Sequence, residues 1–183
     1  CVINQREIGT DTASCADALR AVLREDPDVI LIGEMRDLNT IETALTAAET
    51  GHLVLATLHT KSAADSVDRM VDVFPEGQQR QIRMQLSMIL QAVVSQQLVP
   101  ALDGTEVPAF EVMRVNPAIR NLIREEKTHQ IDSVIAANRS AGMRTMDQSL
   151  FDLVKEGTIA KDIALKYSIH QEALEKRFAA EGI

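Results

Sequence analysis

The sequence predicts an α/β fold, because short apolar strands alternate with amphipathic helices in the first half of the chain. Residues 28–33 (DVILIG) and 52–59 (HLVLATLH) are apolar runs of strand length. Such runs are typical of strands buried on both faces of a parallel sheet. Helices are predicted over residues 39–51 and 61–74, so that strand, helix, strand and helix follow one another. This order is typical of a right-handed βαβ layer.

The elements before the first buried strand are predicted from local signals. Residues 1–8 (CVINQREI) are predicted to form a short strand of mixed polarity. Because the chain opens inside this strand, with Cys rather than Met, we expect it to be part of a longer chain. A helix is predicted over residues 12–26, where apolar residues recur at helical spacing. Thr12 or Ser14 can cap this helix, and Pro27 ends it.

The two helices of the βαβ layer carry their own boundary signals. Asn39 is the predicted N-cap of the helix over 39–51, and Gly51 is its C-terminal stop. The helix over 61–74 is closed by Pro75.

The second half of the chain is predicted to be mostly helical. One long helix is predicted from Glu76 to about Leu98. Residues 106–115 (EVPAFEVMRV) alternate like an edge strand, and ALDGTE before them is typical of a hairpin turn. After Pro117 only helices are predicted, roughly over residues 117–126, 128–138, 145–156 and 171–180. This change predicts two domains, an α/β core over residues 1–115 and a helical subdomain over residues 116–183.

The composition argues against several classes of function, including nucleic-acid binding and zinc binding. The chain has 183 residues, a net charge of −8 and few aromatic residues, with four Phe, one Tyr and no Trp. The acidic balance and the lack of stacking side chains argue against nucleic-acid binding. Two cysteines without a CxxC pair indicate no zinc site and fit a reducing cytosol. No apolar run approaches the roughly 20 residues of a transmembrane helix.

The charged residues that follow the first buried strand form the strongest candidate site. Glu34, Arg36 and Asp37 lie at the carboxyl end of this strand, and His59 lies at the end of the next. Ligands of open α/β sheets bind outside these ends. Glu34 could hold Mg²⁺ directly or through water, and His59 could donate a hydrogen bond to a phosphate. The alternatives are that Asp37 only caps the following helix and that His59 is a core histidine.

Three arginines lie close to the same strand in the sequence. Arg20 and Arg24 are four residues apart on one face of the preceding helix, and Arg36 follows the strand. Guanidinium groups bind phosphate with bidentate geometry. The alternative, equally compatible with the spacing, is that the first two pair with local carboxylates such as Asp17 and Glu25.

Three segments of the sequence resemble motifs of a known protein family. Residues 23–37 (LREDPDVILIGEMRD) resemble the signature of the type II/type IV secretion system ATPase superfamily, and residues 57–75 (TLHTKSAADSVDRMVDVFP) resemble its histidine box. The first segment contains the Walker B element of that superfamily, here Ile30, Leu31, Ile32, Gly33 and Glu34. Residues 118–125 (AIRNLIRE) resemble the helical motif of the PilT-type retraction ATPases of type IV pili. The four-cysteine zinc site of assembly and secretion members has no ligands in this sequence, which favours the retraction branch.

The resemblance implies a RecA-like C-terminal ATPase core followed by a small helical subdomain. It also implies a homo-hexamer that uses ATP and Mg²⁺ to power pilus retraction and twitching motility. The ring would act from the cytoplasm on a pilus platform protein of the inner membrane. No transmembrane segment and no nucleic-acid partner are expected.

The resemblance further implies roles for individual residues. Glu34 would organise the magnesium ion and its water, His59 would lie near the γ-phosphate, and Arg36 would also serve the catalytic site. Three more arginines would serve the nucleotide site or the subunit interface. They are Arg20, Arg24 and Arg69.

The AIRNLIRE segment is implied to be needed for retraction rather than for hydrolysis. It comprises Ala118, Ile119, Arg120, Asn121, Leu122, Ile123, Arg124 and Glu125. The two isoleucines and Leu122 fall on one helix face, which leaves Arg120, Arg124 and Glu125 for a partner. Without the resemblance, an ordinary packed helix would be the simpler interpretation.

A nucleotide site also needs residues that this sequence lacks. No Gly-x-x-x-x-Gly-Lys-Ser/Thr stretch occurs, and the aspartate box of the superfamily is absent as well. We therefore expect the site to require an upstream half and the chain alone to be inactive. The alternatives are a type II secretion or accessory pilus ATPase of the same superfamily, or a non-catalytic interaction module without a P-loop.

Overall fold

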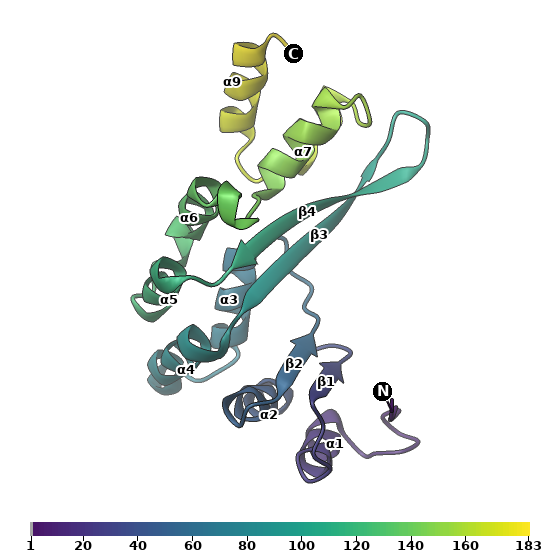
Figure 1. The fold of residues 1–183 in the computed structure, drawn as a ribbon, viewed down its shortest axis with the longest axis vertical. Helices are drawn as coiled ribbons and strands as arrows, with labels where there is room; N and C mark the ends of the chain where they lie inside the picture. The colour runs from purple at the N-terminus through teal and green to yellow at the C-terminus, as the bar shows by residue number, and fades with distance from the viewer. Residues whose placement is uncertain (1) are drawn as a thin grey trace. The chain divides into compact units, whose positions relative to one another are not determined.

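The computed structural model describes residues 2–183, which divide into two compact units (Figure 1). The first unit runs to His59 and includes Arg69–Ile89. The second unit consists of Thr60–Asp68 and Leu90–Ile183. The predicted domain boundary after residue 115 stays a prediction.

The helices and strands follow in an order that can be traced by colour in Figure 1. They are α1 (Cys15–Val22), β1 (Val29–Ile32), α2 (Leu38–Glu49), β2 (Leu53–Ala56), α3 (Ala63–Asp72), α4 (Glu76–Ile89), β3 (Ala92–Pro100), β4 (Glu106–Arg114), α5 (Pro117–Arg124), the 3₁₀ turn η1 (Thr128–Gln130), α6 (Ile131–Ala137), the 3₁₀ turn η2 (Arg139–Ala141), α7 (Met146–Lys155), α8 (Lys161–Tyr167) and α9 (Gln171–Glu181).

The first unit contains the predicted strand–helix–strand arrangement. Strands β1 and β2 are parallel, with Val29 opposite Leu53 and Ile32 opposite Ala56, and α2 connects them. One face of this sheet packs against α1 and α2. The buried residues of this core are Leu19, Ile30, Ile32, Ala44 and Ala47.

The prediction that both strands are buried on both faces is wrong for this chain. In β1, Val29 is 51% exposed and Leu31 is 74% exposed, and in β2 Leu53 and Leu55 are exposed as well. Successive strand residues point to opposite sides of a sheet. The exposed side chains alternate in β1 with the buried Ile30, so their outer face has no cover among residues 2–183.

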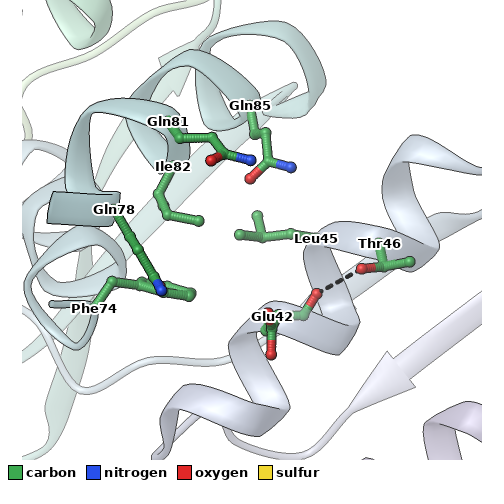
Figure 2. Close-up of a pocket in the computed structure, with 8 residues that line it drawn as sticks. All are labelled: Glu42, Leu45, Thr46, Phe74, Gln78, Gln81, Ile82 and Gln85. Atoms are coloured by element: carbon green, nitrogen blue, oxygen red, sulfur yellow. Dashed lines mark hydrogen bonds between the residues drawn. The ribbon is translucent and has the colours of Figure 1, made fainter.

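A small pocket lies elsewhere in the first unit, between α2 and α4 (Figure 2). Its volume is about 230 Å³. The lining is largely polar and consists of Glu42, Leu45, Thr46, Phe74, Gln78, Gln81, Ile82 and Gln85. The predicted site residues do not line it.

The prediction of one helix from Glu76 to about Leu98 is wrong in its second part. Helix α4 ends at Ile89, and the chain continues as β3, which pairs antiparallel with β4 from Ala92–Arg114 to Pro100–Glu106. The pairing with β4, the next strand along the chain, outweighs the helical spacing of the apolar residues. The predicted turn between the strands is confirmed: the amide of Ala101 donates to the carbonyl of Thr105, and Gly104 adopts φ +84°.

Helices of the second unit cover one face of this hairpin. The rings of Phe151 and Phe178 stack with centroids 5.1 Å apart, and Arg177 lies over the Phe151 ring. The predicted helices of this half are present, and the sequence did not predict α8 (Lys161–Tyr167). The core consists of Val99, Ala109, Met146, Leu150, Phe151, Ile159, Ala164, Leu174 and Phe178.

The N-terminal predictions are confirmed only in part. The predicted strand over residues 1–8 is wrong for residues 2–8, where one isolated bridge joins Ile8 to Thr12, while Cys1 lies outside the described residues. Helix α1 is shorter than predicted and is capped by Ser14, whose hydroxyl accepts from the Asp17 amide.

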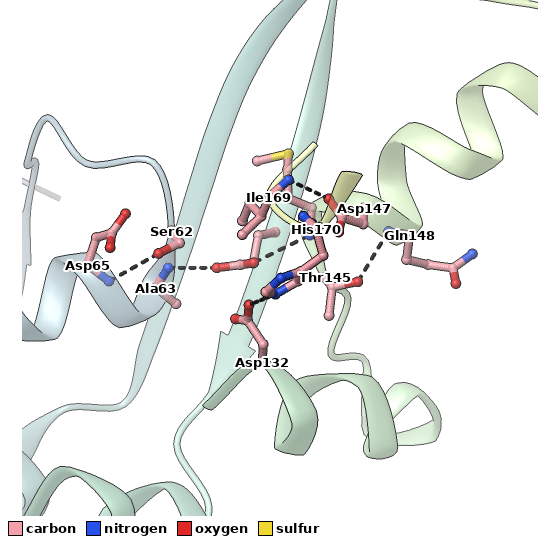
Figure 3. Close-up of polar contacts among 11 residues, drawn as sticks. Ser62, Ala63, Asp65, Asp132, Thr145, Asp147, Gln148, Ile169 and His170 are labelled. Atoms are coloured by element: carbon pink, nitrogen blue, oxygen red, sulfur yellow. Dashed lines mark hydrogen bonds and ion pairs between the residues drawn. The ribbon is translucent and has the colours of Figure 1, made fainter. Parts of the chain in front are cut away.

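A buried carboxylate, Glu111 on β4, joins two helix N-termini of the second unit. Its side chain accepts hydrogen bonds from the amides of Ala63 (2.6 Å) and Met146 (3.3 Å), the first residues of α3 and α7. Figure 3 shows the surrounding polar contacts. Burial raises the pKa of Glu111 to about 6, and the nearby carboxylates of Asp132 and Asp147 act in the same direction.

We expect this shift to make the second unit less stable as the pH rises from 4.5 to about 6. The folded chain holds the Glu111 proton more tightly than the unfolded chain, so raising the pH lowers the free energy of unfolding, by about 2 kcal/mol in all. The Glu111→Gln variant should lose this component in thermal unfolding measured between pH 4 and 7. Glu106→Gln, at an exposed position of the same strand, should follow the wild-type curve. Parallel curves for wild type and Glu111→Gln would contradict the assignment.

Candidate functional site

The turn after β1 is fixed by contacts with the end of β2. The amide of Met35 donates to the carbonyl of Thr57 (3.1 Å), and the hydroxyl of Thr57 donates to the carbonyl of Gly33. These bonds continue the parallel pairing past the last strand residues. They hold Glu34, between the two bonded positions, at the carboxyl end of the sheet.

Glu34 lies between the guanidinium of Arg36 and the imidazole ring of His59. Its carboxylate contacts Nη2 of Arg36 at 2.6 Å and Nε2 of His59 at 3.3 Å. The hydrogen bond from Arg36 holds the pKa of Glu34 below its ordinary value, and the charges of Arg36 and His59 act in the same direction. The same pair raises the pKa of Arg36. Glu34 is therefore a carboxylate at neutral pH, and the exposed partners leave it reachable by a ligand.

Asp37 caps α2, as the alternative interpretation held. Its carboxylate accepts from the Thr40 amide (3.0 Å) and from the Thr40 hydroxyl (2.7 Å). These bonds lower the pKa of Asp37. The prediction of Asn39 as the N-cap is wrong, because α2 already begins at Leu38.

The other predicted arginines are not gathered at Glu34 by any contact seen among residues 2–183. Arg20 pairs with Asp17 on its own helix at 3.2 Å, which is the local pairing considered as the alternative. Glu25, considered for Arg24, pairs with Arg6 instead at 2.6 Å. Arg69 is exposed in the last turn of α3. Roles at a nucleotide or subunit interface stay predictions.

The AIRNLIRE segment forms α5, capped by Asn116, whose side chain accepts from the Ile119 amide at 3.0 Å. Ile119 and Ile123 are fully buried and Leu122 is half-buried, so the predicted apolar face is confirmed. Arg124 is exposed. Glu125 is also exposed and is bonded by Lys127 at 2.7 Å.

Sequence reasoning missed Thr57, which fixes the turn that carries Glu34. A signal for it was present: Thr57 is the first polar residue after the apolar run of β2, the same position that singled out Glu34 after β1. It also missed Glu111, because an isolated glutamate in an alternating strand carries no sign of its buried partners.

Residues 2–183 contain neither a cluster of metal-binding side chains nor a membrane-spanning helix. They hold no group of three or more His, Cys, Asp or Glu side chains placed to bind a metal ion together. None of the helices in this range is both long enough and apolar enough to cross a membrane.

The model of the type II/IV secretion system protein family matches residues 3–166, and the chain belongs to this family. It is 54% identical over 94% of its length to the "Twitching motility protein" of Neisseria gonorrhoeae. It is also 54% identical over 90% of its length to the "Type IV pilus retractation ATPase PilT" of Pseudomonas aeruginosa. The chain covers 46% and 48% of these two proteins, so it spans about half the length of the curated relatives it matches.

A solved structure agrees with the sequence relatives. The chain resembles the "Crystal Structure of the Pilus Retraction Motor PilT and Bound ADP" with a TM-score of 0.87 and 53% sequence identity. The match covers 96% of this chain and 49% of that one. This likeness shows the α/β fold of a PilT-like ATPase.

Proposed function

We propose that this chain is the C-terminal part of a hexameric motor ATPase that hydrolyses ATP to power type IV pilus retraction. The observation that carries the proposal is the 54% identity to the twitching motility and retraction proteins over at least nine-tenths of the chain. The placement of Glu34, Arg36 and His59 within contact distance at the end of two parallel strands supports it. Twitching motility would be the process served.

In this proposal, residues 1–115 belong to a RecA-like core and Ile30–Glu34 form its Walker B element. One carboxylate beside a triphosphate fits the preference of Mg²⁺ for few protein ligands, several waters and substrate phosphates. Glu34 would hold a magnesium-bound water through its negatively charged carboxylate. Before the nucleotide binds, the bond from Arg36 holds the pKa of Glu34 below its ordinary value. Magnesium, when bound, neutralises charge on the transferred phosphate.

The remaining roles follow from the same arrangement. His59 is 82% exposed beside Glu34, so its ring can turn to donate a hydrogen bond to the γ-phosphate. Arg36 would exchange its bond with Glu34 for one with the nucleotide. Arg20, Arg24 and Arg69 would serve the nucleotide site or the interface between subunits.

The partners are proposed on the strength of the same relatives. Copies of the full-length chain would form a ring in the cytoplasm, peripheral to the inner membrane. The ring would act on a pilus platform protein, and α5 (Pro117–Arg124) would be needed for this output.

The first test of the proposal is to sequence the DNA upstream of the codon for Cys1. The DNA upstream of Cys1 should contain, in frame, a P-loop and an acidic box. A start codon at Cys1 without them would favour the non-catalytic interaction module. A deletion strain then separates the remaining alternatives: loss of a retraction motor leaves pili that cannot withdraw, whereas loss of a type II secretion ATPase blocks export.

Arg120→Ala in the full-length protein is expected to retain most ATP turnover and to weaken retraction without abolishing it. Removing an arginine that anchors a partner weakens the contact by about 2 kcal/mol or more. Retraction is measured on single pili and turnover by phosphate release. Arg139→Ala, an exposed arginine outside the motif, is the control and should retain both activities. Equal loss of both activities in Arg120→Ala would show that α5 is not a separate output element.

A further inference from the structure

The residues directly after His59 are fastened to helix α3 by side chains. The hydroxyl of Thr60 lies 2.6 Å from the hydroxyl of Ser66, one turn into the helix. The Ser66 hydroxyl also donates to the carbonyl of Ser62 at 2.9 Å, and Ser62 accepts from the Asp65 amide at 3.1 Å. Ser62 and Ser66 are buried. These bonds tie Thr60, the residue after His59, to the first turn of α3.

Helix α3 is also hydrogen-bonded to β4, which precedes α5, and to η1, which follows it. At its first residue, the amide of Ala63 donates to Glu111 on β4, the strand that leads into α5 (Figure 3). One and a half turns on, Asp68 accepts a hydrogen bond from the hydroxyl of Thr128 at 2.8 Å. Thr128 begins η1, the turn that follows α5. All of these residues belong to the second unit.

Thr128, which bonds to Asp68, lies four residues after the last residue of α5. The amide of Lys127 donates to the carbonyl of Leu122 at 2.9 Å, which closes the end of α5 immediately before Thr128. Thr128 is 7% exposed, so its bond to the Asp68 carboxylate is sheltered from water. A sheltered bond to a charged acceptor is stronger than an exposed one and resists exchange with solvent.

We infer that α3 couples the nucleotide-facing segment at His59 to the retraction helix α5, and that Thr128 is a positioning residue that holds this coupling through Asp68. The inference rests on the proposed function. A helix transmits displacement along its axis because its backbone bonds keep residues at fixed spacing. Coupling needs an element that both sites can bias, and α3 is bonded at one end to Thr60 and further along to Thr128.

The test uses Thr128→Val in the full-length protein, which removes the hydroxyl and retains the shape of the side chain. We expect single-pilus retraction speed to fall about 2- to 30-fold, the range found for mutations along coupling networks. ATP turnover should stay at the wild-type value. The thermal unfolding midpoint should fall slightly, by the loss of one hydrogen bond, and the protein should stay folded at the assay temperature. Thr128→Ser should restore speed, because it returns the hydroxyl. Thr105→Val is the matched control: it removes a Thr–Asp bond of the same kind (2.6 Å to Asp103) in the β3–β4 loop and should retain speed.

A second pair of variants guards against a purely structural effect. Ser66→Ala cuts the link to Thr60 and should be well tolerated in a helix. It should show the same separation of speed from turnover. In an Arg120→Ala background, Thr128→Val should cause no further loss of speed, because both changes would act on one output.

The outcomes separate the inference from the function on which it rests. Wild-type speed in Thr128→Val and Ser66→Ala, equal loss of speed and turnover, or additive loss with Arg120→Ala would each overturn the coupling. Absence of ATP-dependent retraction by the unmodified protein would instead overturn the proposed function.

Discussion

Replacing Glu34 with glutamine in the full-length ATPase is expected to lower its rate of ATP hydrolysis by about 100- to 1,000-fold, the loss that follows removal of one preorganised electrostatic group. Glutamine retains one acceptor oxygen, enough for Arg36 but not for His59 as well, and lacks the negative charge that would organise the magnesium-bound water. The pair with Arg36 is partly exposed, so its loss should cost little stability. Phosphate release and circular dichroism measure the two effects.

The control for this variant is Glu49→Gln, which changes the exposed last residue of α2 in the same unit and should leave turnover unchanged. Near-normal hydrolysis by Glu34→Gln would remove Glu34 from the catalytic site. Loss of the folded spectrum would mean that Glu34 is needed for the fold.

Replacing Glu111 with alanine is expected to destabilise the second unit by about 2–4 kcal/mol. The amides of Ala63 and Met146 would lose their buried acceptor, and each unsatisfied group costs about 1–3 kcal/mol, partly offset because a buried charge is also removed. Scanning calorimetry of the full-length protein should show the transition of this unit at a lower temperature. Glu106→Ala on the same strand, with an exposed side chain, should leave that transition unchanged. An unshifted transition in Glu111→Ala would show that water or other groups satisfy both amides.

The parts of the fold that the sequence predicted correctly are those with strong local signals. Strands β1 and β2 are apolar runs, and α2 lies between a capping carboxylate and Gly51. Strand β3 was missed because its stability comes from pairing with β4, and because Val93 also fits the helical spacing of the apolar residues before it. The exposed outer face of β1 and β2 was missed for a similar reason, since an apolar run does not reveal which of its faces finds a partner.

In the candidate site, too, the features with local sequence signals were predicted and those that depend on distant side chains were not. The closeness of Glu34 and His59 was predicted from strand order alone, because the ends of parallel neighbours meet at one edge of the sheet. Their catalytic roles stay predictions. The contacts of Glu111 and Thr128 could not be predicted, since they join residues 48 and 60 positions apart through side-chain geometry.

The capping of α2 by Asp37 has a consequence for how the motif can change over generations. Glu34, Arg36 and Asp37 look like one block of charges, yet the last serves the backbone of its own helix. Asparagine, serine and threonine accept the same amide bond. Position 37 can therefore drift among four residue types with the helix start intact, whereas position 34 has only its carboxylate to offer. The three charged residues look like one motif in a sequence comparison, but position 34 and position 37 are constrained by different requirements.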